Sequence, residues 1–200
     1  MAVSFRFSFD KFLAAIQHMA TEEVPELDTY KILKLLFLAD KQHLVRFGRP
    51  ITGDRYVAME YGPVGSESYD LIKGFTSTRG RQPVPADARI EQMASALELD
   101  VRFLHPRFSA KTPPEFSCLS PSDLMALDRV VEKFGAMGFN ELRSITHSVY
   151  AYRKTWRDSP NGTMSFEDFF EEDSDAIEGA RELMLENAET LEAFPSIDDL

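Results

Sequence analysis

The sequence is short of cysteine and of long apolar runs, and each shortage excludes something. Cys118 is the only cysteine in 200 residues, so the chain forms no internal disulfide. No charged-then-apolar leader precedes Phe5. Lys34, Asp40 and Lys41 interrupt the most apolar stretch. We therefore expect neither secretion nor a membrane-spanning helix, and we expect the reducing cytoplasm as the location.

The motifs of the common enzyme classes are also missing. The sequence has no glycine-rich phosphate loop, no Cys-x-x-Cys, no His-Glu-x-x-His and no Gly-x-Ser-x-Gly. Asp40 and His43 share a helix face and, with His147 or Glu60, are the candidate metal ligands. Four scattered histidines without a close pair instead favour hydrogen-bonded structural roles for His43 and His147. We expect no catalytic residues, no metal and no cofactor.

Basic residues are almost absent from the C-terminal segment. Residues 165–200 contain 13 acidic residues and one basic residue, Arg181, which gives a net charge of −12. Residues 1–164 contain 20 acidic and 21 basic residues, so the rest of the chain is nearly neutral. Such a field repels nucleic acid and suits a basic protein partner. We expect no binding of nucleic acid or membrane.

What the sequence does contain is a strongly apolar helix over residues 31–47. Asp28 is its expected N-cap, and Gly48 stands where a left-handed residue ends a helix. Its apolar residues leave little polar face, so the middle of this helix should be surrounded by protein. A basic cluster lies near its end: Lys41, Arg46, Arg49 and Arg55. This cluster is a phosphate-binding patch, a solvated face or a docking site for the acidic C-terminal helix.

The remaining pattern predicts short elements around this helix. Ser8 is expected to cap a first helix, and residues 56–61 read as a strand that ends at Gly62-Pro63. A short helix over residues 66–73 should stop at Gly74, followed by an exposed loop over 76–85. A weaker helical pattern covers 87–97. A strand over 99–103 should pair with 115–119, which places Cys118 in a buried strand and makes a small sheet of three strands.

Helices dominate the second half of the chain. Ser120, Pro121 and Asp123 form a strong helix start. Asn140 is the expected cap of the next helix, which should extend through Tyr152, and residues 156–163 read as a loop. From about Ser174 an acidic helix follows, with an apolar seam every seven residues at Ile177, Met184 and Leu191.

Several motifs together resemble one family, the Panacea domain of SocA-like antitoxins. They are Lys34-Leu-Leu-Phe-Leu-Ala-Asp40, Gly48-Arg-Pro-Ile-Thr-Gly-Asp54, Tyr56-Val-Ala58, Gly62-Pro-Val64 and Tyr69-Asp70, then Leu119-Ser-Pro-Ser-Asp123, Leu127-Asp128, Val131, Gly135, Leu142 and Thr146-His147. The resemblance spans residues 30–152. It implies a bacterial or phage antitoxin that binds a toxin encoded beside it and holds that toxin inactive. It also implies an alternative, an adaptor that delivers the toxin to an ATP-dependent protease, and it brings no catalytic residues.

We therefore predict an α+β, mostly helical single domain around a central buried helix, with a small antiparallel sheet. Residues 1–156 form the Panacea-like domain and 157–200 an acidic helical extension. The expected partner is a cognate toxin, bound through the turn at residues 61–64 and through the acidic helix. The candidate partner-binding residues are Arg55, Tyr56, Tyr61, Gly62, Pro63, Val64, Tyr69, Glu178 and Glu182. Whether the three tyrosines are exposed or pack the sheet on the central helix stays open.

Overall fold

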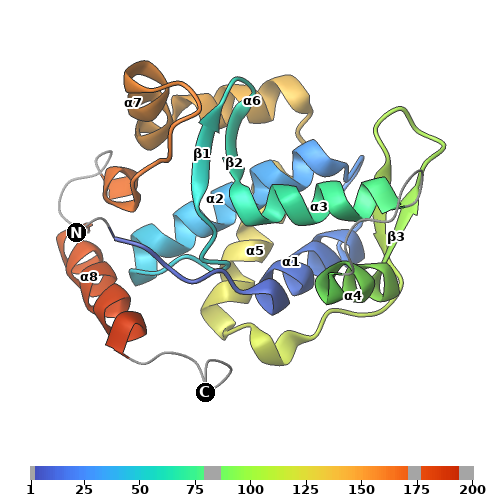
Figure 1. Ribbon diagram of the computed structural model, residues 1–200, viewed down its shortest axis with the longest axis horizontal. Helices are drawn as coiled ribbons and strands as arrows, with labels where there is room; N and C mark the ends of the chain where they lie inside the picture. The colour runs from blue at the N-terminus through green and yellow to red at the C-terminus, as the bar shows by residue number, and fades with distance from the viewer. Residues whose placement is uncertain (1–2, 79–86, 171–176, 194–200) are drawn as a thin grey trace.

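The computed structural model describes residues 3–78, 87–170 and 177–193, and within them the protein is mostly helical (Figure 1). The α-helices are α1 (Phe9–Thr21), α2 (Thr29–Phe47), α3 (Ser66–Thr78), α4 (Ala88–Ala96), α5 (Pro121–Phe134), α6 (Phe139–Ser148), α7 (Tyr150–Asp158) and α8 (Ile177–Ala193). The strands are β1 (Tyr56–Met59), β2 (Gly62–Gly65), β3 (Leu97–Asp100) and β4 (Arg107–Ala110), and the 3₁₀ turns are η1 (Phe116–Cys118) and η2 (Phe166–Phe170). The predicted α+β class is confirmed.

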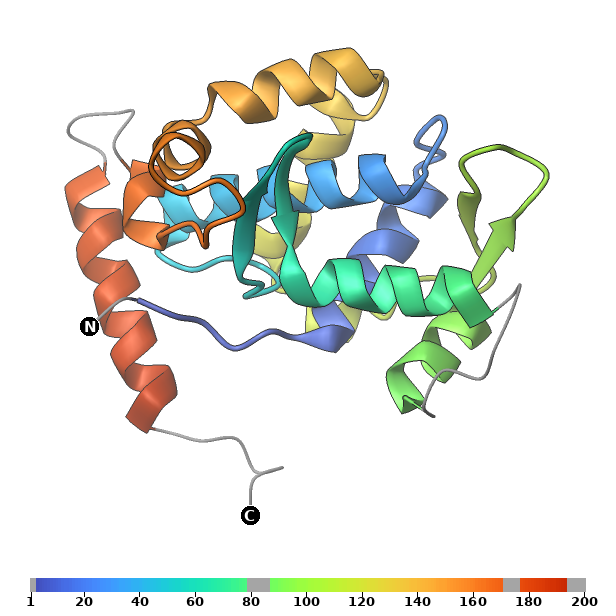
Figure 2. The same ribbon diagram turned by 45° about the horizontal axis from the view of Figure 1, so that its top comes forward.

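The fold is built around α2, as predicted. The Asp28 side chain accepts a hydrogen bond from the Lys31 amide at 2.8 Å, and Gly48 ends the helix at φ 68°. The apolar side chains from Ile32 to Ala39 are buried. The β1–β2 hairpin crosses α2, with α3 on one side and α6 on the other (Figures 1 and 2). Contact on all sides explains why this helix carries almost no polar face.

The strands form two separate hairpins, so the predicted three-stranded sheet is wrong. β1 pairs with β2 from Tyr56↔Gly65 to Met59↔Gly62, which makes Gly62-Pro63 the start of a strand instead of a stop. β3 pairs with β4 from Leu97↔Ala110 to Asp100↔Arg107. The expected partner, 115–119, contains η1 instead, where the half-buried Cys118 donates to the Glu115 carbonyl. A local turn there competes with strand pairing.

The helix α3 continues past Gly74, where the sequence predicted its end. A Cβ atom at Gly74 would lie 2.5 Å from Cδ1 of Ile90, so the bare backbone lets α4 pack closely against α3. This packing offsets the roughly 1 kcal/mol that glycine costs inside a helix. Residues 76–78 of the predicted loop are therefore helical, and its residues 79–85 lie outside the described chain.

Two boundaries in the second half also differ from prediction. The cap of α6 is Gly138, whose amide donates to the Glu141 carboxylate at 2.9 Å, while Asn140 lies in the first turn. The chain then breaks at Val149, which has an extended backbone, and Trp156 belongs to α7 instead of a loop. The predicted cap pair Ser120 and Asp123 of α5 is confirmed as a capping box.

The acidic helix α8 lies against the C-terminal end of α2, while its predicted start at Ser174 falls outside the described residues (Figures 1 and 2). Asn187 donates from its amide nitrogen to the Gly48 carbonyl at 3.3 Å, and Met184 is fully buried. The helix thus docks beside the basic cluster, but two of the cluster's residues bond elsewhere: Arg49 pairs with Asp123, and Arg55 donates to the Ser66 hydroxyl. Among the described helices, none has the length and apolarity needed to cross a membrane.

Candidate functional site

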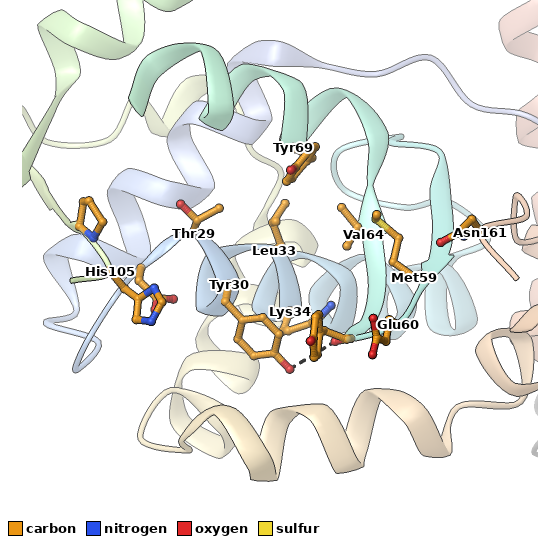
Figure 3. A pocket seen from close by; sticks show the side chains of 13 residues that line it. Thr29, Tyr30, Leu33, Lys34, Met59, Glu60, Val64, Tyr69, His105 and Asn161 are labelled. Atoms are coloured by element: carbon orange, nitrogen blue, oxygen red, sulfur yellow. Dashed lines mark hydrogen bonds between the residues drawn. The ribbon is translucent and has the colours of Figure 1, made fainter. Parts of the chain in front are cut away.

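A groove of about 450 Å³ lies over the N-terminal half of α2 (Figure 3). The tip of the β1–β2 hairpin, α3 and the loop between β3 and β4 enclose it. Its lining is mostly apolar or aromatic: Asp28, Thr29, Tyr30, Leu33, Lys34, Met59, Glu60, Tyr61, Val64, Tyr69, His105, Pro106 and Asn161. A concave site with a few polar groups is the form that binding sites commonly take.

Four aromatic residues, Tyr30, Tyr61, Tyr69 and Phe139, stand in or beside this groove, and we call them the aromatic rim. The side chain of Tyr61 is 53% exposed, and those of Tyr69 and Phe139 are exposed as well. The rings of Tyr30 and Phe139 lie 4.3 Å apart, and the Tyr30 hydroxyl donates to the Tyr61 carbonyl. Burial raises the pKa of Tyr30 to about 12, so this hydroxyl remains a donor at neutral pH.

The floor of the groove contains a buried lysine. Lys34 is 1% exposed, and its Nζ donates to the Pro63 carbonyl at 2.7 Å. The ammonium lies 5.0 Å from the Tyr30 ring centroid, and a Cβ at Gly62 would lie 3.1 Å from it. Burial lowers the pKa of Lys34 to about 7. No carboxylate among the described residues forms an ion pair with this lysine.

Two further basic side chains, Arg143 and His147 of α6, line a neighbouring hollow on the other side of Tyr61. The Arg143 guanidinium lies 5.6 Å from the Tyr61 ring centroid, and His147 packs 4.5 Å from the Tyr152 ring. In the described structure, Nε of Arg143 and Nε2 of His147 are buried without a hydrogen-bond partner. Burial, and then the charges of Arg143 and Lys34, lower the pKa of His147. Basic groups therefore gather around this site, and none of the described carboxylates forms an ion pair with Lys34 or Arg143.

The family whose description is "Antitoxin SocA-like, Panacea domain" matches residues 32–151, which is more than half of the chain. The chain belongs to this family. The match suggests an antitoxin role and confirms the resemblance expected from the sequence. Neither the curated proteins nor the solved structures contain a significant match. Families of this type are generally non-enzymatic, and the described residues contain no group of three or more His, Cys, Asp or Glu placed to hold a metal.

The Panacea domain supplies most of the groove, and three predicted residues line it: Tyr61, Val64 and Tyr69. Gly62 and Pro63 are buried in β2, and the Pro63 carbonyl accepts the hydrogen bond from Lys34 of α2. Two of the three tyrosines are thus exposed at this site.

The prediction that Tyr56 binds the partner is wrong. The side chain of Tyr56 is 2% exposed, and its hydroxyl donates to the Asp40 carboxylate at 2.8 Å. Tyr56 therefore packs the hairpin on α2 and does not reach the surface.

Three other predicted residues lie away from the groove. Arg55 is exposed and donates to the Ser66 hydroxyl. Glu182 is exposed on α8. Glu178 belongs to the same helix, but its side chain is outside the described part.

Two of the candidate metal ligands, Asp40 and His43, have structural roles in the Panacea domain. The Asp40 carboxylate accepts hydrogen bonds from the Ile51 and Thr52 amides and from the Thr52 and Tyr56 hydroxyls. Burial raises the pKa of Asp40 to about 6. Nδ1 of His43 hydrogen-bonds to the Arg49 carbonyl at 2.7 Å, which confirms its structural role. The same expectation of a hydrogen-bonded role for His147 is wrong, because its Nε2 has no partner in the described structure and its ring packs on Tyr152.

Sequence reasoning missed Tyr30, Lys34, Phe139 and Arg143 as members of this site. A signal existed for Lys34, since a lysine inside an otherwise apolar helix must be paired or face a cavity. For Phe139 the signal was weaker, an aromatic residue directly after the helix-capping Gly138. No local pattern connects α2 with α6, so their meeting at the groove needed the tertiary structure.

Proposed function

We propose that the protein is an antitoxin that neutralises its cognate toxin by direct binding at the groove. The observation that carries this proposal is the aromatic rim, which lies exposed around an apolar hollow largely inside the family-matched residues. Rigid aromatic rings provide large contact areas at little cost in conformational entropy, and they dominate the binding energy of many interfaces. A bound toxin segment would cover them.

The test uses the protein encoded beside this chain. Its expression alone should stop growth, and co-expression with this chain should restore growth and give a complex that co-purifies. Replacing Tyr61 and Tyr69 together by alanine should abolish rescue, because the two rings flank the groove. Phe116→Ala is the matched control, since Phe116 is 45% exposed but lies in η1, outside the groove lining. Rescue by the double variant would contradict the proposal.

The acidic helix α8 is a second proposed contact, through Glu178 and Glu182, for a basic toxin surface. Deleting residues 165–200 is a poor test, because η2 buries Phe166, Phe169 and Phe170 in the core. Replacing both glutamates by glutamine removes charge without removing packing. We expect slower association, most clearly at low salt, because such contacts are screened by ions. Unchanged association rates at low salt would remove α8 from the interface.

A second candidate function is the protease adaptor, favoured by another exposed apolar surface. Leu183 and Leu185 are exposed on α8, at the opposite end of α2 from the groove. An adaptor needs two surfaces, one for the toxin and one for the protease. If the protein is an adaptor, the cellular half-life of the toxin shortens when it is present, and Leu183→Ser with Leu185→Ser reverses this. A stoichiometric inhibitor leaves the bound toxin stable.

A further inference from the structure

The unusual feature of the groove is the Lys34 ammonium. An ammonium group has three donors, and in the described structure the Pro63 carbonyl is the one hydrogen-bond acceptor of this group. Buried charges are normally paired, because a lone charge in a low-dielectric site is unfavourable. Lys31 shows the usual solution one turn earlier, where Nζ donates to both the Pro25 and Gly135 carbonyls. Lys34 lines a groove open to a partner, and Lys31 does not.

Among the residues that the structure describes, no group around Lys34 supplies a negative charge that pairs with it. Arg143 and His147 of α6 add basic groups, and the Asp28 carboxylate already caps α2. Glu60 at the hairpin tip is exposed and forms no ion pair with Lys34. The other titratable groups facing this site are Tyr30, Tyr61, Tyr69, His105 and Tyr152. Phenols and histidine provide no anion here at neutral pH.

We propose that the groove recognises a partner segment in which an aspartate or glutamate is flanked by apolar residues, and that its carboxylate pairs with Lys34 and Arg143. The inference rests on the proposed function and specifies the chemistry of the toxin segment. The flanking apolar residues contact Leu33, Val64 and the aromatic rim. The carboxylate enters beside the Lys34 ammonium, whose acceptor in the described structure is the Pro63 carbonyl, and near Arg143, whose Nε has no hydrogen-bond partner there.

The surroundings favour one carboxylate over a polyphosphate. The groove walls are mostly apolar, and the acidic side chains of Asp28 and Glu60 stand at its margin. A nucleic-acid backbone would bring several phosphates close to these carboxylates, and like charges repel. A peptide segment carries its single charge to the floor and places apolar atoms against the walls. A protein segment therefore fits this groove better than an anionic polymer.

The pairing has a consequence that calorimetry can measure. In the free protein Lys34 has a pKa of about 7, so at pH 8 most molecules hold it neutral. A carboxylate beside it raises this pKa, so complex formation takes up roughly 0.9 proton per molecule. Titration of the purified protein with the co-encoded toxin at pH 8, in buffers of different ionisation enthalpy, gives this number directly. We expect uptake by the unmodified protein and its loss in Lys34→Met.

Three further variants separate pairing from folding. Lys31→Met is the matched control, because Lys31 is buried on the same helix but lies outside the groove, and its proton uptake should stay normal. Lys34→Met and Arg143→Met should each weaken binding by about 30-fold or more, since each leaves the toxin carboxylate incompletely paired. Thermal unfolding of each variant shows whether it is folded. In the toxin, one Asp→Asn or Glu→Gln change should remove the uptake and be non-additive with Lys34→Met.

The outcomes distinguish this inference from the function on which it rests. Absence of proton uptake, or uptake that persists in folded Lys34→Met, overturns the carboxylate pairing. Neutralisation that still depends on Tyr61 would then leave the proposed function standing. If no complex forms with the co-encoded protein, the proposed function falls, and the pairing falls with it.

Discussion

Charged side chains near the two ends of α2 differ in whether they have a partner of opposite charge. At the C-terminal end, acidic and basic side chains meet inside the fold: Asp123 of α5 lies 2.8 Å from Lys11 Nζ and 2.9 Å from Arg49 Nη2. Lys34 lies about 14 Å nearer the N-terminal end than His43, which contacts Asp123. Lys34 and Arg143 have no acidic partner among the described residues. At the C-terminal end the ion pairs hold the helices together. Beside the groove, the basic groups without an acidic partner indicate that a carboxylate of another protein binds there.

The largest effect is expected at the paired end. Asp123→Ala removes both ion pairs and the N3 carboxylate that accepts from the Ser120 amide. Removing this fully buried carboxylate from two partly exposed cations should lower the free energy of unfolding by about 3 kcal/mol, measured by urea denaturation. Asp128→Ala is the control on the same helix. Asp128 pairs with His18 but is largely exposed, so about 1 kcal/mol or less is expected. Equal losses would contradict the contrast.

The next effect concerns pH at the unpaired end. The pKa of Lys34 falls from 10.5 in the unfolded chain to about 7 in the folded protein, because burial disfavours its charge. Between these values the unfolded chain binds more protons, so stability rises with pH from about 7 to about 10. Lys34→Met should lack this rise and be more stable than the unmodified protein at pH 6, by on the order of 2–3 kcal/mol. If the free energy of unfolding, measured with urea, depends on pH in the same way for both proteins between about pH 6 and about pH 10, the expected burial penalty is contradicted.

A pair of hydroxyl deletions compares the buried and exposed tyrosines. Tyr56→Phe removes the donor to the buried Asp40 carboxylate and should cost about 1–3 kcal/mol. Tyr61→Phe deletes an exposed hydroxyl at the groove and should change the free energy of unfolding by about 0.5 kcal/mol or less. Chemical denaturation measures both. A larger loss for Tyr61→Phe would mean that the aromatic rim supports the fold more than it serves binding.

The smallest effect is expected where α8 docks. A Cβ at Gly48 would lie 2.7 Å from the Met184 backbone nitrogen, and alanine at φ 68° is strained by about 1–2 kcal/mol. Gly48→Ala should therefore weaken the packing of α8 on α2. An added protease should then cleave α8 faster than in the unmodified protein. Gly179→Ala is the control, since nothing lies within 4 Å of its added carbon and helix propensity improves. Toxin affinity should be unchanged in Gly179→Ala.

Much of the fold could be predicted from local signals. The caps Asp28, Ser8 and Ser120 and the end at Gly48 were all found, because each depends on hydrogen bonds within one turn. Predictions failed where distant residues decided the outcome. Close packing of Ile90 against Gly74 allows α3 to continue past this glycine. Pairing with β1 makes Gly62-Pro63 part of a strand.

The candidate site divides in the same way. The sequence by itself determined a buried α2, an aromatic turn around Tyr61 and a family membership that suggests an antitoxin. Only the tertiary structure decided that Tyr56 is buried, that Tyr30 and Phe139 join Tyr61, and that no described carboxylate pairs with Lys34. The physical reason is the sequence distance over which each interaction acts. Capping and helical periodicity act over a few residues, whereas burial and charge pairing depend on which distant segments the packed core brings together.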